Sequence, residues 1–184
     1  MELDFPGGRI RSWRAADAPS LSRHANNRNI WLQVRDRFPH PYTLAHAESW
    51  VTMAPAADPE TQFAIEVEGT AVGGIGLFLQ QDVERYSAEI GYWLGEAYWG
   101  KGIATAAVRV FTEDAFRRFG LCRIYANVFA SNPGSCRVLE RCGYQFEGRM
   151  RQASVKNGQV LDSLLYATVR EFKGGERKAV SGRR

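Results

Sequence analysis

Two glycines at the start of an apolar, helix-forming segment are the residues of this sequence best suited to chemistry. Gly100 and Gly102 precede a run in which, from Ala104, apolar residues recur with the spacing of a helix that buries one face. Residues 88–94 before them are rich in strand-forming side chains, and Gly120 stands where a helix commonly ends. A strand, a glycine-rich turn and a helix in this order direct unpaired backbone N–H groups and the positive end of the helix at one point. Such a turn is suited to binding phosphate.

The spacing within this turn separates the common classes of phosphate-binding loop. A dinucleotide-binding turn needs a third glycine three residues after Gly102, where this chain has Thr105. A nucleoside-triphosphate loop needs Ser or Thr directly after Gly-Lys, but Lys101 is followed by Gly102. The pattern that remains is Gly-x-Gly-x-Ala at the start of a helix. On these residues alone, a tight strand-to-helix turn without a ligand stays open as the alternative.

A second short pattern follows about thirty residues later in the chain. After a strand-like run at residues 122–128, the sequence reads Asn132-Pro133-Gly134-Ser135 and continues as a helical pattern that ends near Gly143. Asn is a preferred N-cap, Pro is favoured at the first helical position and Gly commonly follows the last turn. Helix capping therefore explains the pattern by itself, although a capping Asn132 also sits where it can reach a ligand.

Together the two patterns resemble those of the GNAT N-acetyltransferase superfamily. Its acetyl-coenzyme A loop usually reads Gln/Arg-x-x-Gly-x-Gly/Ala and is followed by an Asn-x-x-Ser/Ala element. Gly102 and Ala104 match the last two fixed positions of the loop, whereas Trp99 stands where Gln or Arg is usual. The resemblance runs from Arg9 to about Phe172 and is strongest to the RimJ/RimL-like branch, which acetylates protein N-termini and assorted small amines.

The resemblance implies a fold and a cofactor. The expected fold is α+β, with residues 1–172 forming a single domain around a central mixed, mostly antiparallel sheet flanked by helices. Acetyl-coenzyme A is the expected acetyl donor, held between two diverging strands at residues 87–94 and 122–128. Backbone groups of the first strand would pair with the pantetheine arm and donate to the acetyl oxygen, and the glycine-rich turn would bind the pyrophosphate. The residues expected at the cofactor are Tyr92, Trp93, Leu94, Trp99, Gly100, Lys101, Gly102, Ile103, Ala104, Thr105, Asn132 and Ser135.

The same resemblance implies direct attack by a primary amine, which must first lose its proton. Glu89 lies on the strand that leads to the cofactor turn and is the candidate general base, with a cross-strand salt bridge as the alternative role. Many members of the superfamily protonate the departing thiolate with a tyrosine, but the corresponding position here holds Leu139. Ser135 is the second candidate catalytic residue, as a hydrogen-bond donor to the sulfur. Its alternative role is that of an ordinary residue in the first helical turn.

The expected acceptor is the N-terminal α-amine of a protein. An α-amino group has a free pKa of about 7.7–8.0, so more of it is neutral at pH 7 than of a lysine side chain, with a pKa of about 10.4. A small amine (polyamine, antibiotic or amino acid) is one alternative, and a non-catalytic acyl-coenzyme A binding module, for which Leu139 is the main hint, is another. Candidates for the acceptor pocket are the aromatic residues Trp31, Phe38 and Tyr42, joined by Trp50; each also fits a hydrophobic core.

Composition narrows the remaining classes of protein. Hydrophobic residues make up 45% of the 184 residues and no apolar run approaches the ~18 needed to span a bilayer, so we expect an ordered protein without a membrane anchor. The first residues show no signal peptide, and Cys122, Cys136 and Cys142 are odd in number and lack metal or disulfide spacing. We therefore expect a cytoplasmic protein that binds no metal; the three histidines also form no metal-binding pattern. The family resemblance implies a monomer or a homodimer.

The formal net charge of +4 lies entirely in residues 173–184, which hold five basic residues and one acidic residue. The rest of the chain is neutral, with 19 basic and 19 acidic residues. We therefore expect a basic, glycine-containing tail that is disordered, and no basic face for nucleic acid.

Local patterns also predict individual elements. We expect a strand at residues 9–13, a helix at 21–27, a helix capped by Thr43, a hairpin formed by 62–67 and 71–78, and a late hairpin with the turn Asn157-Gly158.

Overall fold

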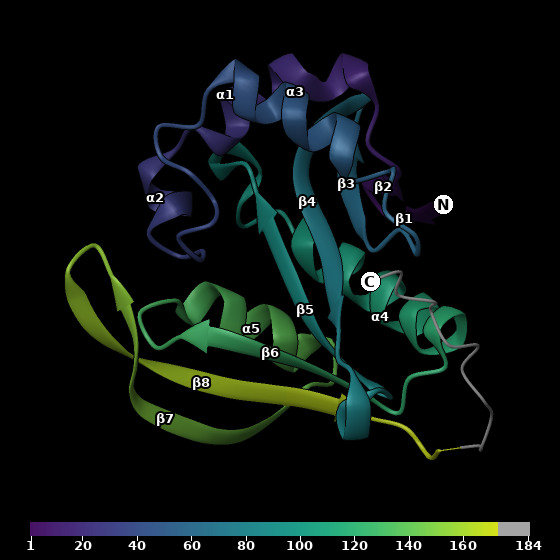
Figure 1. The fold of residues 1–184 in the computed structure, drawn as a ribbon, viewed down its shortest axis with the longest axis vertical. Coiled ribbons are helices and arrows are strands. Elements are labelled where there is room, and N and C mark those ends of the chain that lie inside the picture. Colours follow the sequence, from purple (N-terminus) through teal and green to yellow (C-terminus); the bar gives the residue numbers. More distant parts are fainter. Residues whose placement is uncertain (173–184) are drawn as a thin grey trace.

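The computed structural model describes residues 1–172, and its centre is an eight-stranded sheet (Figure 1). The strand order is β1-β2-β3-β4-β5-β6-β8-β7, and of the seven pairings only that between β5 and β6 is parallel. The prediction of an α+β fold with a mixed, mostly antiparallel sheet is thus confirmed. The predicted basic tail, residues 173–184, lies outside the described residues.

The strands are β1 (Glu2–Phe5), β2 (Gly8–Arg11), β3 (Gln62–Val67), β4 (Thr70–Leu79), β5 (Ser87–Leu94), β6 (Arg123–Phe129), β7 (Gln145–Lys156) and β8 (Gln159–Val169). The α-helices are α1 (Ala18–Ala25), α2 (Arg28–Trp31), α3 (Leu44–Met53), α4 (Ile103–Phe119) and α5 (Pro133–Arg141). Three short 3-10 segments are η1 (Ala15–Asp17), η2 (Asp82–Glu84) and η3 (Glu96–Tyr98).

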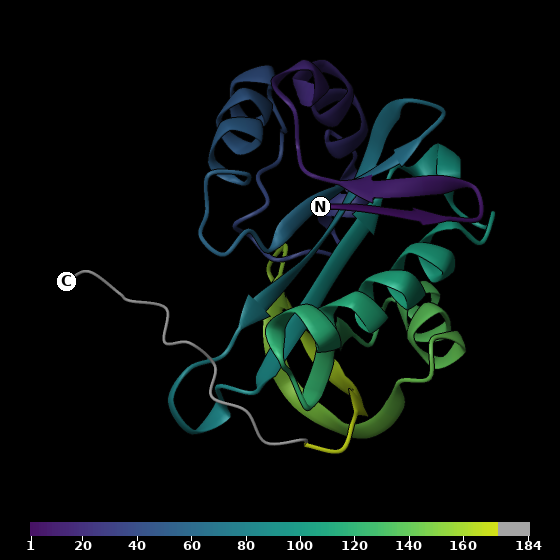
Figure 2. The ribbon, with the colours of Figure 1, turned by 90° about the vertical axis from the view of Figure 1, so that its right-hand side faces the viewer.

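One face of the sheet is covered by α4, which crosses the strands beside α5 (Figure 2). Both ends of α4 are glycines in the left-handed region, Gly102 with φ 80° and Gly120 with φ 57°. The cap at Gly120 was predicted from the sequence, and the conformation of Gly102 was not. Between them the helix buries Val108, Phe111 and Ala115, among others, in the larger of two hydrophobic clusters. This packing fixes the direction of the N-terminus of α4, and therefore the place of the glycine-rich turn.

The other face of the sheet carries α1 and α3, which pack against each other over β4. Thr43 caps α3 by accepting a hydrogen bond from the backbone N–H of His46, at 3.2 Å. Nearby, the guanidinium of Arg11, 2% exposed, donates two hydrogen bonds to the carboxylate of Asp17 at 2.7 and 2.8 Å and also pairs with Glu66. Because a buried arginine is tolerated only with such partners, this cluster ties β2 to the start of α1.

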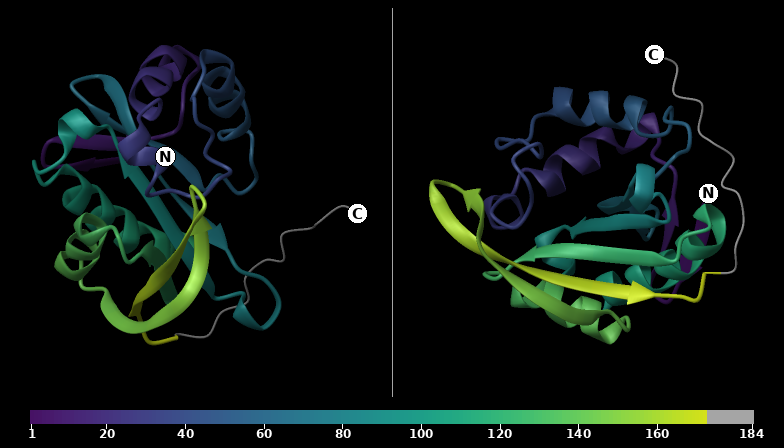
Figure 3. Two further views of the ribbon diagram at one scale, coloured as in Figure 1. Left: turned by 90° about the vertical axis from the view of Figure 1, so that its left-hand side faces the viewer. Right: turned by 60° about the horizontal axis from the view of Figure 1, so that its bottom comes forward.

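The last two strands form a long hairpin that curves toward α2 (Figure 3). Its turn is Asn157-Gly158, with φ of 50° and 74°, the positive values that a two-residue hairpin turn favours. The hairpin was predicted from this dipeptide, but its curvature and its contact with α2 were not.

Near the N-terminus, several elements were not predicted from the sequence or have other bounds than predicted. The first strand ends at Arg11 rather than Trp13 and pairs with an unpredicted strand, β1. The helix expected at residues 21–27 starts earlier, at Ala18, because Pro19 occupies its first turn and Asp17 precedes it. The short α2 was not predicted. Within the described residues, no helix is long and apolar enough to cross a membrane, and no group of three or more His, Cys, Asp or Glu side chains is placed to hold a metal ion.

Candidate active site

The site begins where β5 and β6 separate. The two strands are paired only at their starts, from Ser87 opposite Arg123 to Glu89 opposite Tyr125, and then diverge (Figure 1). Each strand stays paired on its outer edge, β5 with β4 as far as Leu94 and β6 with β8 as far as Phe129. Beyond Glu89, the inner edge of β5 therefore has no partner strand in the described part of the chain. Its backbone groups are free to pair with an extended ligand.

The glycine-rich turn follows directly after β5. Gly100 and Gly102 have φ of 73° and 80°, and no side chain caps the N-terminus of α4. The first-turn N–H groups of α4 are therefore left for a ligand or water. The indole of Trp99 donates to the carbonyl oxygen of Leu94 at 2.7 Å, so the residue that replaces the usual Gln or Arg binds the chain back onto its own strand. Lys101 lies over the ring of Tyr98, 5.4 Å from its centroid.

The start of α5 contacts β5 beyond the point where β5 and β6 diverge. Asn132 caps the helix by accepting from the backbone N–H of Ser135 at 3.0 Å, which confirms the predicted cap. The Ser135 hydroxyl lies 2.7 Å from the Tyr92 hydroxyl of β5, and either group can be the donor. Leu139 is fully buried in the large hydrophobic cluster. Tyr92 and Ser135 thus place two hydroxyl groups in the opening between β5 and β6.

A cavity of about 1010 Å³ occupies this opening and extends to the loop after α2 and to α3. Its walls come from the loop between α2 and α3, from β4, β5 and β6, from the start of α5 and from the β7–β8 hairpin. The residues of the glycine-rich turn are not among those that line it. The cavity is therefore a candidate for the acceptor end of the site, and of the residues expected at the cofactor it is lined by Tyr92, Trp93, Asn132 and Ser135.

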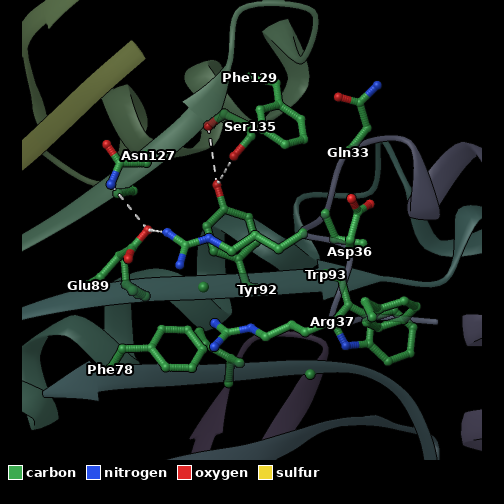
Figure 4. Close-up of a pocket in the computed structure, with 18 of the residues that line it drawn as sticks. Gln33, Asp36, Arg37, Phe78, Glu89, Tyr92, Trp93, Asn127, Phe129 and Ser135 are labelled. Atoms are coloured by element: carbon green, nitrogen blue, oxygen red, sulfur yellow. Dashed lines mark hydrogen bonds and ion pairs between the residues drawn. The ribbon is translucent and has the colours of Figure 1, made fainter. Parts of the chain in front are cut away.

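Glu89 stands at the point of divergence, 8% exposed, with its carboxylate toward the cavity (Figure 4). It forms an ion pair with Arg35 from the loop after α2 and accepts a hydrogen bond from the Asn127 amide at 3.3 Å. The expected alternative, a cross-strand salt bridge, is thus replaced by an ion pair to a loop. The Arg35 side chain is half exposed, so a cationic ligand can compete with it for Glu89.

Aromatic side chains form one wall of the cavity. Phe38 lies 5.0 Å from Tyr42 and 5.5 Å from Trp93, measured between ring centroids. Gly74 of β4 makes room for Trp93, because a Cβ there would lie 2.7 Å from the indole nitrogen. Burial raises the pKa of Tyr42 to about 12, which keeps its hydroxyl protonated at neutral pH. Phe38, Tyr42 and Trp50 line the cavity, and their role in binding the acceptor stays a prediction.

Trp31, in contrast, does not line the cavity. Its ring stacks on His40, with centroids 5.4 Å apart, and carries the ammonium of Lys156 at 4.0 Å on its face. Lys156, near the tip of the β7–β8 hairpin, is 3% exposed and donates to Asp36 at 2.7 Å. Through Lys156, Trp31 instead helps to hold the hairpin against the loop after α2.

Many residues that line the cavity were not predicted from the sequence, among them the polar and charged residues Arg35, Asp36, Arg37, Asn127 and Lys156. None belongs to a local pattern, since Arg35 is 54 positions from Glu89 and Lys156 is 120 positions from Asp36. The only available signal was an excess of arginine just after α2, which a solvated loop explains equally well.

Comparisons with known proteins agree with this geometry. The family model described as the Acetyltransferase (GNAT) domain matches residues 9–145. "Probable N-acetyltransferase YjcK" of Bacillus subtilis is 40% identical over 145 residues, covering 71% of this chain and 80% of that protein. The ribosomal-protein-serine acetyltransferase of Escherichia coli is 35% identical over 107 residues, covering 58% of this chain and 59% of that protein. The chain spans between about half and four fifths of the length of the curated relatives it matches first.

Solved structures show the same fold. RimJ of Mycobacterium smegmatis, in complex with a coenzyme A disulfide, superposes with a TM-score of 0.80 and 28% identity, covering 92% of this chain and 86% of that one. A ribosomal-protein-S5-alanine acetyltransferase from Vibrio fischeri superposes with a TM-score of 0.81 at 20% identity, which shows the fold alone.

Proposed function

Because the chain belongs to the GNAT acetyltransferase family, we propose that it transfers an acetyl group from acetyl-coenzyme A to the N-terminal α-amine of a protein. The observation that carries this proposal is the opening between β5 and β6, where an unpaired strand edge, a carboxylate and two hydroxyl groups meet. The relative from Escherichia coli, named for a ribosomal-protein serine, supports the choice of acceptor. Free thiols at all three cysteines support a cytoplasmic location.

The residues present fit acetyl-coenzyme A. The free edge of β5 at Tyr92, Trp93 and Leu94 would pair with the amides of the pantetheine arm, and an N–H of the same edge would donate to the acetyl oxygen. The turn from Gly100 to Thr105 offers backbone N–H groups to the pyrophosphate. When bound, the cofactor supplies an acetyl group activated as a thioester.

Glu89 is the proposed general base. Its carboxylate is buried at the point where the cofactor end and the acceptor end of the site meet, and Arg35 and Asn127 orient it. In this role it accepts a proton from the acceptor amine, directly or through a water molecule. An α-amine, with a pKa of about 7.7–8.0, gives up this proton more readily at neutral pH than a lysine side chain, with a pKa of about 10.4.

Ser135 and Tyr92 are the proposed donors to the departing sulfur. Burial raises the pKa of Tyr92 well above its ordinary value, so its hydroxyl is protonated throughout the physiological range. That hydroxyl lies 2.7 Å from the Ser135 hydroxyl and 3.2 Å from the Ser135 carbonyl oxygen, and Ser135 lines the cavity. Leu139, buried in the core, takes no part.

Two measurements on the full chain test the proposed function. Calorimetry with acetyl-coenzyme A reports cofactor binding, and mass spectrometry together with thiol release reports acetylation across a panel of peptides and small amines. We expect cofactor binding and acetylation of peptide α-amines. Acetylation of small amines alone would favour the second acceptor class, binding without any acetylated product would favour a sensor, and no binding at all would overturn the proposal.

A further inference from the structure

The cavity at the proposed acceptor end of the site carries more positive than negative charge. Its charged side chains are Arg35, Arg37, Lys156, Asp36 and Glu89. Four of these form two ion pairs, Arg35 with Glu89 and Lys156 with Asp36. The fifth, Arg37, has no acidic side chain within ion-pair distance among the described residues.

Arg37 is held in place by an aromatic ring instead of a carboxylate. Its guanidinium carbon lies 3.9 Å from the centroid of Phe78, and Figure 4 shows its side chain ending beside that ring. Partial burial and the neighbouring Arg35 lower the pKa of Arg37 from its ordinary value, yet an arginine stays charged at any physiological pH. A stacked guanidinium keeps its N–H edge available, so Arg37 presents unused donors to the cavity.

We propose that the acceptor carries an anionic group, such as a carboxylate, close to its amine, and that Arg37 together with Arg35 binds that group. This inference rests on the proposed function, because it concerns the acceptor of the same reaction. The ammonium form of the acceptor takes the place of the Arg35 guanidinium at Glu89. Arg35, half exposed and paired only with Glu89 among the described residues, then turns with Arg37 toward the acceptor's anion.

The charge arrangement also determines which acceptors are disfavoured. An acceptor with an ammonium and a carboxylate leaves the cavity's charge balance unchanged, whereas a polyamine adds several positive charges beside Arg35, Arg37 and Lys156. Like charges at short range oppose binding, and a guanidinium without a carboxylate gains most from an anion. An acidic residue next to the N-terminus, or the carboxylate of a free amino acid, supplies the required chemistry.

The test compares acceptors that differ in one charge. The first arm uses peptides that begin Ser-Asp, Ser-Asn or Ser-Lys and are otherwise identical; the second uses free serine and serinamide. Binding to the full-length protein is measured by calorimetry with coenzyme A present, so that it does not depend on turnover, and kcat/KM is measured for the peptides. We expect the Ser-Asp peptide to exceed the Ser-Asn peptide by about tenfold in both. A preference in the second arm alone would identify a free amino acid as the source of the anion.

Charge reversal at one position separates recognition from a structural role. Arg37→Glu is expected to invert the order, so that the Ser-Lys peptide becomes the best acceptor, while affinity for acetyl-coenzyme A stays unchanged. Arg117→Glu, on the exposed surface of α4, makes the same change of net charge away from the cavity and should leave the order as it is.

Two failures can be told apart. Equal binding of acidic and neutral acceptors in both arms, or an order that Arg37→Glu leaves unaltered, overturns the anion site whether or not acetylation occurs. Absence of acetylated product from every acceptor, with the charge preference in binding intact, overturns the proposed function and leaves the anion site standing.

Discussion

The two ends of the site are built in different ways. The proposed cofactor end consists of consecutive backbone, from the free edge of β5 through Gly100 and Gly102 to the first turn of α4. The acceptor end consists of side chains from segments far apart in the sequence, such as Arg35 with Glu89 and Lys156 with Asp36. A diphosphate is bound by backbone geometry that tolerates many side chains, whereas an acceptor is selected by charge and shape. Substitutions should therefore affect one end without the other.

The largest expected effect falls on chemistry at the acceptor end. Glu89→Gln keeps the size of the side chain but removes the base, so kcat should fall by about a hundredfold and lose much of its rise with pH. Affinity for acetyl-coenzyme A should not change. Steady-state rates from pH 6 to 9 at saturating cofactor give the comparison. Glu147→Gln, which breaks a surface ion pair with Arg123, is the matched control, and an unchanged pH profile in Glu89→Gln would remove this residue from the mechanism.

The next largest effect tests the cofactor end. Gly102 has φ of 80°, so Gly102→Val strains the turn although no atom lies within 4 Å of the new Cβ. The strain of about 1–3 kcal/mol should weaken acetyl-coenzyme A binding by tenfold or more, as measured by calorimetry. Gly148→Val, at a glycine with ordinary φ and open surroundings, is the control. Equal cofactor affinity in both variants would show that the turn does not need its left-handed conformation.

A smaller effect is expected where the hairpin meets the loop after α2. Lys156→Met keeps the length of the side chain but removes the ion pair to Asp36 and the charge on Trp31. Because Asp36 is largely exposed, it remains solvated, and the KM for the acceptor should rise by about three- to tenfold. Lys101→Met removes the same charge at the cofactor end. If acceptor KM responds to Lys101 and not to Lys156, the assignment of the two ends is wrong.

The smallest expected effect is on the pH dependence of stability, through His24, which packs against Tyr98 just before the glycine-rich turn. His24 lies edge-on to Tyr98, 5.6 Å between centroids, and burial, with a contribution from Arg23, lowers its pKa below the ordinary value of 6.5. Because the pKa of His24 is lower in the folded chain, the unfolded chain binds the proton more readily. The stability that neutral His24 contributes is therefore present above pH 6.5 and is lost as the pH falls. Urea unfolding at pH 7.5 and 5.5 should show a slight loss that His24→Gln removes. A loss of the same size in both proteins would assign it to other groups.

The difference between a site made of consecutive backbone and one made of distant side chains also explains which features could be predicted from the sequence. Gly102 and Gly120 at the ends of α4, Asn132 at the start of α5 and Asn157-Gly158 in the last turn are local signals, because the backbone conformation at each position favours that residue. The mixed sheet followed from the family resemblance and the strand patterns.

The acceptor end could not be predicted in this way. Arg35 and Arg37 look like residues of a solvated loop until the fold brings that loop over β4 and β5. Trp31 was expected in the pocket because it is aromatic and early in the chain, but stacking on His40 and the Lys156 contact hold it outside. Such pairings arise from tertiary packing, which periodicity and spacing do not encode.

Amide hydrogen exchange with and without acetyl-coenzyme A tests the division of the site most directly. We expect the cofactor to protect the amides of β5 beyond Glu89 and of residues 100–105, and to leave the exchange of the loop at residues 33–37 and of the tip of the β7–β8 hairpin unchanged. Protection confined to that loop and the hairpin tip, with none at residues 100–105, would contradict it.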